Sequence, residues 1–248
     1  TNLISPIKQV AQSSVRGILR IFGIGIDRIS RFPKETLIGL SHRPIKTVID
    51  CGANQGQFAR YISRFFPQAE LLCFEPLMDP FRDLEVWAGT QHGRVKCFNL
   101  ALGEKDDTAV MYHHVDHAQS SSILSTTEHE AALFPQTLQQ VGVSVIVRSL
   151  DSVIGSRLNV LESEILLKLD VQGYEDRVLR GAKKLLRVVD ACLLEVCIDP
   201  LYRDQASFVD LVSFLSEQGL KYAGNLDQVY GEDGRVMWFD ALFTRNRI

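Results

Sequence analysis

From residue 46 onward, short apolar runs alternate with amphipathic segments, and this alternation constrains the fold of the 248-residue chain more than any other feature. Runs such as TVID, LLCF, ILLKLD and ACLLEV are apolar at consecutive positions, as in strands that are covered on both faces. Strands that alternate with helices indicate a parallel sheet. We therefore predict a doubly wound, mostly parallel α/β fold, with strands at Thr47–Asp50, Glu70–Phe74, Val95–Leu100, Ile165–Asp170 and Ala191–Val196 and helices at Gln57–Phe66, Pro80–Trp87, Tyr174–Leu186 and Gln205–Gln218.

Two segments interrupt or extend this alternation. An insertion at about residues 103–164 separates the third and fourth strands and contains strand-like runs at Ala109–His114 and Val143–Ser149. The C-terminal runs Lys221–Val229 and Arg235–Thr244 are joined across a turn that contains two glycines, which predicts an antiparallel hairpin. Residues 46–248 are thus expected to form one α/β domain, because single domains of this size are common.

The first 45 residues differ from the rest in charge and in periodicity. Residues 1–46 hold eight lysines and arginines against Asp27 and Glu35, and apolar residues between Val15 and Ile29 recur at helical spacing. We expect residues 1–45 to form an amphipathic helical appendage that packs on protein, either on the main domain or in self-association with a second copy. Peripheral contact with a membrane surface is the alternative.

Composition excludes several classes of partner. The formal net charge of −3 and the pI of about 6.1 argue against nucleic acid as a partner. Five cysteines without a CxxC pair indicate reduced thiols rather than a disulfide framework or a zinc site. No run has the length of a membrane span, and a cytoplasmic location is the simplest expectation.

The first predicted strand ends in T-V-I-D-C-G-A-N-Q-G-Q-F, where a parallel sheet of this kind binds nucleotide-like ligands. Its glycines allow close approach of the backbone to a ligand, but the dinucleotide fingerprint GxGxxG is absent. An acidic loop repels a diphosphate and attracts a cation, and S-adenosylmethionine carries an ammonium and a sulfonium group. We therefore predict that S-adenosylmethionine is bound here, and the candidate residues are Asp50, Gly52, Ala53, Asn54 and Gly56.

The next strand ends extend this site. Glu75 ends the second strand at about the offset that is expected for a carboxylate that binds ribose. Asn99 and Ala101 lie at the end of the third strand and are predicted to line the adenine. Asp170 ends the fourth strand, and Glu175 opens the next helix, where the helix dipole favours a carboxylate in any case.

The ordered runs D-C-G-A-N-Q-G-Q-F, F-E-P, N-L-A-L-G, S-L-D, L-K-L-D-V-Q-G-Y-E and L-L-E-V resemble the FkbM family of S-adenosylmethionine-dependent methyltransferases over about residues 46–198. The chain has Gln172 where many members of the family have Glu, which weakens any role that requires charge there. The resemblance implies a Rossmann-like methyltransferase sheet. It also implies, as for many members, O-methylation of a sugar or of a hydroxyl on a secondary metabolite.

A hydroxyl acceptor must lose its proton during methyl transfer, so a base is expected near the methyl group. Asp170 is the first candidate for this catalytic role and Glu175 the second, although either could instead hold the ammonium group of the cofactor. Histidines of the insertion are further candidates, and a divalent metal on acidic side chains is an alternative that we do not predict. The histidines are His113, His114 and His117, and the acidic side chains are Asp170, Glu175 and Glu195.

Two rival functions remain, a nicotinamide-dependent oxidoreductase and a non-catalytic nucleoside-binding module.

Overall fold

A computed structural model of the chain describes residues 33–37, 39–114, 118–134 and 139–245. By its internal contacts the chain divides into Thr1–Ile38 and Gly39–Ile248. The short helix α2 (Pro33–Thr36) belongs to the first unit. The amphipathic helix that the sequence predicts at Val15–Ile29 lies outside the described residues.

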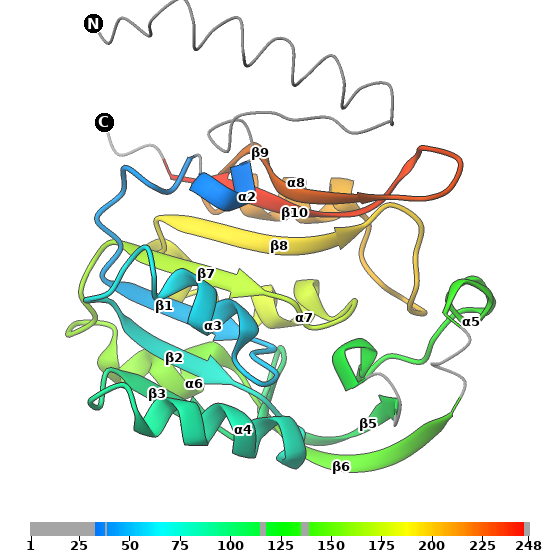
Figure 1. Ribbon diagram of the computed structural model, residues 1–248, viewed down its shortest axis with the longest axis horizontal. Helices are drawn as coiled ribbons and strands as arrows, with labels where there is room; N and C mark the ends of the chain where they lie inside the picture. The colour runs from blue at the N-terminus through cyan, green and yellow to red at the C-terminus, as the bar shows by residue number, and fades with distance from the viewer. Residues whose placement is uncertain (1–32, 38, 115–117, 135–138, 246–248) are drawn as a thin grey trace, which may run out of the picture. The chain divides into compact units, whose positions relative to one another are not determined.

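The second unit is built on a seven-stranded sheet with the order β3-β2-β1-β7-β8-β10-β9 (Figure 1). The first five of these strands in space are parallel, and β10 and β9 are antiparallel, which confirms the predicted sheet and its C-terminal hairpin. The strands are β1 (Thr47–Cys51), β2 (Glu70–Phe74), β3 (Val95–Phe98), β7 (Ile165–Leu169), β8 (Ala191–Cys197), β9 (Lys221–Tyr230) and β10 (Val236–Thr244).

Helices cover both faces of this sheet, as the continuous apolar runs require. Every residue of β1 and of β7 is buried. In Figure 1, α3 (Gln57–Ile62) and α4 (Met78–Gly89) lie on one face, and α6 (Leu150–Ile154), α7 (Glu175–Arg180) and α8 (Phe208–Glu217) lie on the other. The main hydrophobic core joins the latter three helices to the strands through residues such as Ile154, Leu179 and Leu215. Strands without a solvated face are therefore apolar at most positions, with Asp50 and Lys168 as buried exceptions.

Helix α7 is shorter than the segment Tyr174–Leu186 that the sequence predicts. It ends at Gly181, and a Cβ atom at that position would lie 2.0 Å from the backbone oxygen of Gly103. The chain then continues through a separate 3₁₀ turn at Leu185–Arg187. Close packing of two backbones thus ends a helix that the apolar periodicity would extend.

The insertion forms a second, three-stranded sheet with the order β4-β6-β5. Its strands are β4 (Ala101–Leu102), β5 (Asp107–His114) and β6 (Gln140–Arg148). The two strands that the sequence predicts here are confirmed and are longer than expected. A short 3₁₀ turn (Ala118–Ser120) and α5 (Glu128–Leu133) lie between β5 and β6, and a second turn (Gly155–Arg157) follows α6.

The insertion is tied by hydrogen bonds to the loop that follows β8. Thr127 N donates to Leu201 O over 2.9 Å, and Arg203 N donates to Ser125 O over 2.8 Å. The side chain of Tyr202, which is 1% exposed, donates to Ser120 O over 2.9 Å. Residues 120–127 are therefore held beside the carboxyl ends of β7 and β8.

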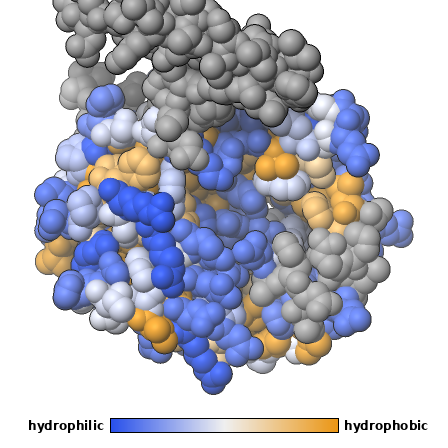
Figure 2. Space-filling view, in the orientation of Figure 1, coloured by the Kyte–Doolittle hydropathy of each residue, from blue (hydrophilic) through white to orange (hydrophobic). Residues whose placement is uncertain are grey.

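The helices of the described residues are short or amphipathic. None of the helices in this part of the chain combines the length and the apolar character that crossing a bilayer requires. On the face shown in Figure 2, hydrophilic side chains predominate and hydrophobic ones form scattered patches.

Candidate active site

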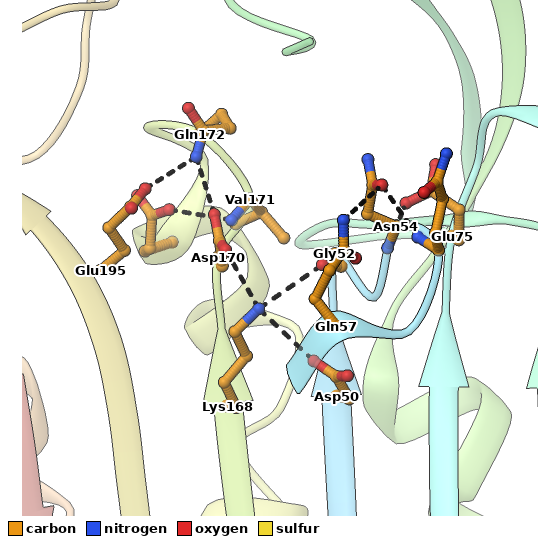
Figure 3. Close-up of polar contacts among 12 residues, drawn as sticks. Asp50, Gly52, Asn54, Gln57, Glu75, Lys168, Asp170, Val171, Gln172 and Glu195 are labelled. Atoms are coloured by element: carbon orange, nitrogen blue, oxygen red, sulfur yellow. Dashed lines mark hydrogen bonds and ion pairs between the residues drawn. The ribbon is translucent and has the colours of Figure 1, made fainter. Parts of the chain in front are cut away.

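The candidate site lies where the carboxyl ends of β1, β2, β3 and β7 meet at one edge of the sheet. Strand β1 pairs in parallel with β2 and with β7, and β2 pairs with β3. The strand that leads to Asp170 thus lies directly beside the strand before the glycine loop. Figure 3 shows the two groups of polar side chains that result, one around Glu75 and one around Asp170.

The loop after β1 is fixed between the ends of β2 and β7. The backbone N–H groups of Gly52 and Ala53 donate to Phe74 O over 3.0 and 2.9 Å. Gly52 has a φ of +77°, and a Cβ atom there would lie 1.9 Å from the backbone oxygen of Asp170. No other residue type fits this position without displacement of the backbone. The side chain of Ala53 is buried, and its backbone N–H helps to connect the loop to the end of β2.

Glu75 joins the glycine loop to the start of α4. Its carboxylate oxygens accept hydrogen bonds from Asn54 N over 2.9 Å and from Leu77 N over 2.8 Å. The residue is 4% exposed, and burial raises the pKa of its carboxyl to about 7. The two backbone N–H groups favour the charged form and oppose this rise. Each carboxylate oxygen has a second lone pair, so Glu75 can still accept hydrogen bonds from a ligand.

Asn54 and Gly56 shape the same loop. Asn54 has a φ of +47°, and its side-chain oxygen accepts hydrogen bonds from Gln55 N and Gln57 Nε2. Gly56, with a φ of +86°, precedes the first turn of α3. These hydrogen bonds fix the conformation of the loop at the edge of the sheet.

Asn99 lies beside Glu75, whereas Ala101 does not face the site in the way that the sequence suggested. The Asn99 side-chain N–H groups donate to Glu75 O and Pro76 O, both over 3.0 Å, so the amide oxygen is the group that remains for a ligand. Ala101 is 5% exposed and packs with Val145 and Val147 in the core of the small sheet. This packing does not favour the predicted contact of Ala101 with adenine.

Asp50 requires a correction, because the sequence predicts that it meets the cationic cofactor directly. The side chain is fully buried and lies within β1, one residue before the strand ends. Its partner is Lys168, whose Nζ lies 3.4 Å from Asp50 Oδ1. Burial raises the pKa of Asp50 although Lys168 opposes this. The buried carboxylate therefore offsets the charge of a buried lysine.

Lys168 is the residue that sequence reasoning missed. Its Nζ donates to Asp170 Oδ2 over 3.1 Å and to Gly52 O over 3.5 Å, and it lies 5.4 Å from the centre of the Phe58 ring. Burial alone would lower the pKa of Lys168, but the adjacent carboxylates outweigh burial and raise it above its ordinary value. The signal was available, because a lysine inside a fully buried strand needs a charged partner.

Asp170 lies at the edge itself, and its side chain is 34% exposed. Lys168 donates to one of its oxygens, and Gln172 Nε2 donates to the other over 2.7 Å. The same Gln172 nitrogen donates to Glu195 Oε2 over 2.7 Å. The site thus places a held but accessible carboxylate beside a second carboxyl group from β8.

Glu175 faces inward. The residue is 3% exposed, and its Oε1 accepts hydrogen bonds from Val171 N over 3.1 Å and from Gly173 N over 3.3 Å. Burial raises the pKa of this carboxyl to about 7. These contacts give Glu175 a structural part in the loop after β7, and they do not favour its predicted catalytic role.

Two of the candidate histidines, His113 and His114, lie on β5. His113 Nδ1 lies 3.2 Å from Ser121 Oγ, and His114 is fully buried. Ser122, next in the chain, donates from Oγ to Gln172 O over 2.6 Å, which brings this end of β5 close to the Asp170 loop. His117 lies outside the described residues. Within the described part of the chain, no group of three or more histidine, cysteine or acidic side chains is placed to hold a metal ion.

Two curated proteins are similar to the chain. The 2-O-methyltransferase NoeI of Sinorhizobium fredii is 28% identical over 215 residues, which cover 80% of this chain and 84% of NoeI. The AMB antimetabolite synthetase AmbE of Pseudomonas aeruginosa is 27% identical over 193 residues, or 65% of this chain. The chain spans only 9% of the length of AmbE.

A solved structure shares the fold of the chain, and a family model matches its sequence. The methyltransferase FkbM of Methylobacillus flagellatus matches the fold with a TM-score of 0.50 and 13% identity, over 81% of this chain and 44% of that one. The model of the methyltransferase FkbM domain matches residues 50–222, which include every strand from β2 to β8 and the loops of the site. The chain therefore belongs to the FkbM family of methyltransferases.

Proposed function

We propose that the protein uses S-adenosylmethionine to methylate a hydroxyl group of a small molecule or glycan. The observation that carries this proposal is the pair of carboxylates at the ends of the two strands that flank β1. Glu75 follows β2, and Asp170 follows β7, with the glycine loop of β1 between them. This arrangement suits a nucleoside on one side of the loop and a reacting group on the other.

The residues present fit S-adenosylmethionine. The two oxygens of Glu75 each accept one backbone N–H and can each accept one ribose hydroxyl. The amide oxygen of Asn99 is placed for the adenine, and the loop at Gly52 allows close approach of the amino-acid end. When bound, the cofactor supplies an electrophilic methyl group on its sulfonium.

Asp170 is proposed to act on the acceptor. An exposed carboxylate at this strand end can accept a hydrogen bond from the hydroxyl and orient it for in-line attack, or take its proton as the new bond forms. The hydroxyl preference is supported by NoeI, which is named a 2-O-methyltransferase. Residues 46–248, with the insertion at about 103–164, are proposed to form the methyltransferase domain.

The rival functions differ in what they predict. A nicotinamide-dependent oxidoreductase needs a loop that receives a diphosphate, whereas this loop follows a buried acid and lacks GxGxxG. Membership in a methyltransferase family also disfavours it. A non-catalytic nucleoside-binding module would share the Glu75 side of the site but would not depend on Asp170.

The test combines binding with turnover. Calorimetry measures binding of S-adenosylhomocysteine to the wild type and to E75Q, and mass spectrometry follows methyl transfer from S-adenosylmethionine to a panel of glycans and hydroxylated metabolites. We expect binding that weakens in E75Q and a methylated hydroxyl product. Absence of binding would overturn the proposal, and binding without any methylated product would favour the non-catalytic module.

A further inference from the structure

The side chain of Gln172 is held from several directions at the centre of the Asp170 side of the site. Its backbone has a φ of +53°, which is uncommon for a residue other than glycine, and its carbonyl accepts a hydrogen bond from Ser122 Oγ. Its side-chain Oε1 lies 2.8 Å from the hydroxyl of Tyr202. The Tyr202 ring leaves no room for a Cβ atom at Gly173, so the loop and the ring fix each other.

The amide nitrogen of Gln172 faces two carboxyl groups at once. Nε2 lies 2.7 Å from Asp170 Oδ1 and 2.7 Å from Glu195 Oε2 (Figure 3). An amide NH₂ has two hydrogens, one for each oxygen. The reverse orientation would place the amide oxygen against the oxygens of both carboxyl groups and lose both of these hydrogen bonds.

This position matters because Asp170 and Glu195 lie among several charged groups. Lys168 Nζ contacts Asp170 Oδ2 over 3.1 Å, and Gln172 Nε2 lies between Asp170 and Glu195. Burial and the nearby acids raise the pKa of Glu195 well above its usual range. The groups that face Asp170 or Glu195 are Lys168 on β7, Asp50 on β1, Glu175 on α7, Asp240 on β10 and the thiol of Cys197 on β8.

We propose that Gln172 is a positioning residue whose neutral amide holds the carboxyl groups of Asp170 and Glu195 in place at the edge of the sheet. The amide donates to one oxygen of each carboxyl group and adds no charge of its own. Lys168 and Gln172 together give each oxygen of Asp170 one donor, so the carboxylate keeps one orientation toward the edge. The consequence for methyl transfer rests on the proposed function, but the effect on ionisation does not.

The primary test measures ionisation in the free protein, without cofactor or acceptor. Carboxyl carbons of aspartate and glutamate are labelled with ¹³C, and the signals of Asp170 and Glu195 are assigned with D170N and E195Q. Q172L removes both donors without a new charge, and we expect the titration midpoint of Asp170 to rise by about one pH unit. Q172E also adds a carboxylate and should raise it further.

Matched variants separate this role from a merely structural one. S122A removes the hydrogen bond to the Gln172 backbone and keeps the side-chain amide, so the midpoint of Asp170 should stay at its wild-type value. Y202F frees the amide to rotate and should cause a smaller rise, which provides a second test if Q172L folds poorly. An unchanged midpoint in Q172E and Y202F, or a rise in S122A as large as in Q172L, would overturn the proposal.

The same variants distinguish this inference from the proposed function. If the wild type methylates an acceptor, the acid limb of its rate profile should move to higher pH in Q172L, in step with the midpoint of Asp170. A shift of the midpoint in a protein that transfers no methyl group would overturn the proposed function and leave the role of Gln172 standing. Methyl transfer by the wild type, together with an Asp170 midpoint that is unchanged in the variants, would support the proposed function and overturn the role of Gln172.

Discussion

At the scale of single residues, Glu75 is expected to couple cofactor binding to pH. A carboxylate accepts ribose hydroxyls better than a neutral acid does, and burial raises the pKa of Glu75 to about 7. Binding of S-adenosylhomocysteine should therefore weaken as pH falls through 7, because binding must first release a proton from Glu75. Calorimetry between pH 6 and 8.5 measures this.

Two variants of Glu75 complete this prediction. E75A leaves two ligand hydroxyls without their acceptor and should cost about 2–3 kcal/mol of binding free energy at pH 8. E75Q should bind more weakly than the wild type at pH 8 and show little dependence on pH. A wild-type affinity that is level across this range would show that Glu75 does not meet the ligand in its ionised form.

Asp170 is expected to act on the rate more than on binding. D170N keeps the size of the side chain but loses its charge and basicity, and removal of a catalytic acid or base typically lowers the rate 10²–10⁴-fold. We therefore expect kcat to fall on that order, with a smaller change in the affinity for S-adenosylhomocysteine. Turnover close to wild type together with a collapsed affinity would instead make Asp170 a binding residue.

Gly52 offers a prediction that concerns packing alone. In G52A the new Cβ atom would collide with the backbone oxygen of Asp170, so the loss should exceed about 4 kcal/mol of unfolding free energy. The control is G93A, since Gly93 has a similar φ of +79° but a Cβ atom there would meet no other atom within 4 Å, and this variant should lose only about 1 kcal/mol. Urea denaturation followed by circular dichroism compares the two, and equal losses would mean that the backbone angle, not the contact with the end of β7, requires glycine.

At the scale of elements, the first turn of α7 carries a buried acid with a structural task. Folding raises the pKa of Glu175 from an ordinary value of 4.5 to about 7, so the folded state binds more protons in that window. Its contribution to stability is fully present below pH 4.5 and is lost as pH rises toward 7. E175Q can still accept the N–H groups of Val171 and Gly173 without burying a charge.

The stability of E175Q relative to wild type should therefore be greater at pH 8 than at pH 5. Urea midpoints at the two pH values measure this difference. A difference that is the same at both values would show that Glu175 does not change its protonation in this window.

Much of the fold was predictable from the sequence, because each buried strand leaves an uninterrupted apolar run and each hairpin strand is bounded by turn residues. The end of α7 was not, since it depends on the approach of Gly103 to Gly181 across the chain. The pairing of Asp50 with Lys168 was also hidden. The two residues are direct partners in the register of β1 and β7, and neither the register nor the facing side chain follows from either strand alone.

The residues of the candidate site also fall into those that the sequence could predict and those that it could not. Glu75 and Asp170 could be predicted because their places depend only on where a strand ends in a parallel sheet. The roles of Gln172 and Tyr202 could not, because they arise from contacts between the loop after β7, the loop after β8 and the insertion. Side chains that bridge three segments leave no periodic signal in any of them.

At the scale of the whole molecule, two regions of the described chain compete as the place where a nucleoside could bind. One is the carboxyl edge of the parallel sheet with its glycine loop. The other is a groove of about 470 Å³ on α7 and α8, whose lining includes Arg177, Arg180, Asp204 and Phe214. The groove mixes acidic and basic side chains, whereas the edge combines the carboxylate of Glu75 with the glycine loop that follows β1.

Hydrogen exchange with and without S-adenosylhomocysteine tests this choice. A bound ligand lowers the rate at which the segments that it contacts open. We expect added protection at residues 52–57, 75–78 and 170–174, three segments far apart in sequence that the sheet brings to one edge. The hairpin turn at 231–234 should exchange as before, and E75Q under the same conditions should show less protection in all three segments. Protection confined to residues 176–180 and 204–217 would move the ligand to the groove and reject the sheet edge as the cofactor site.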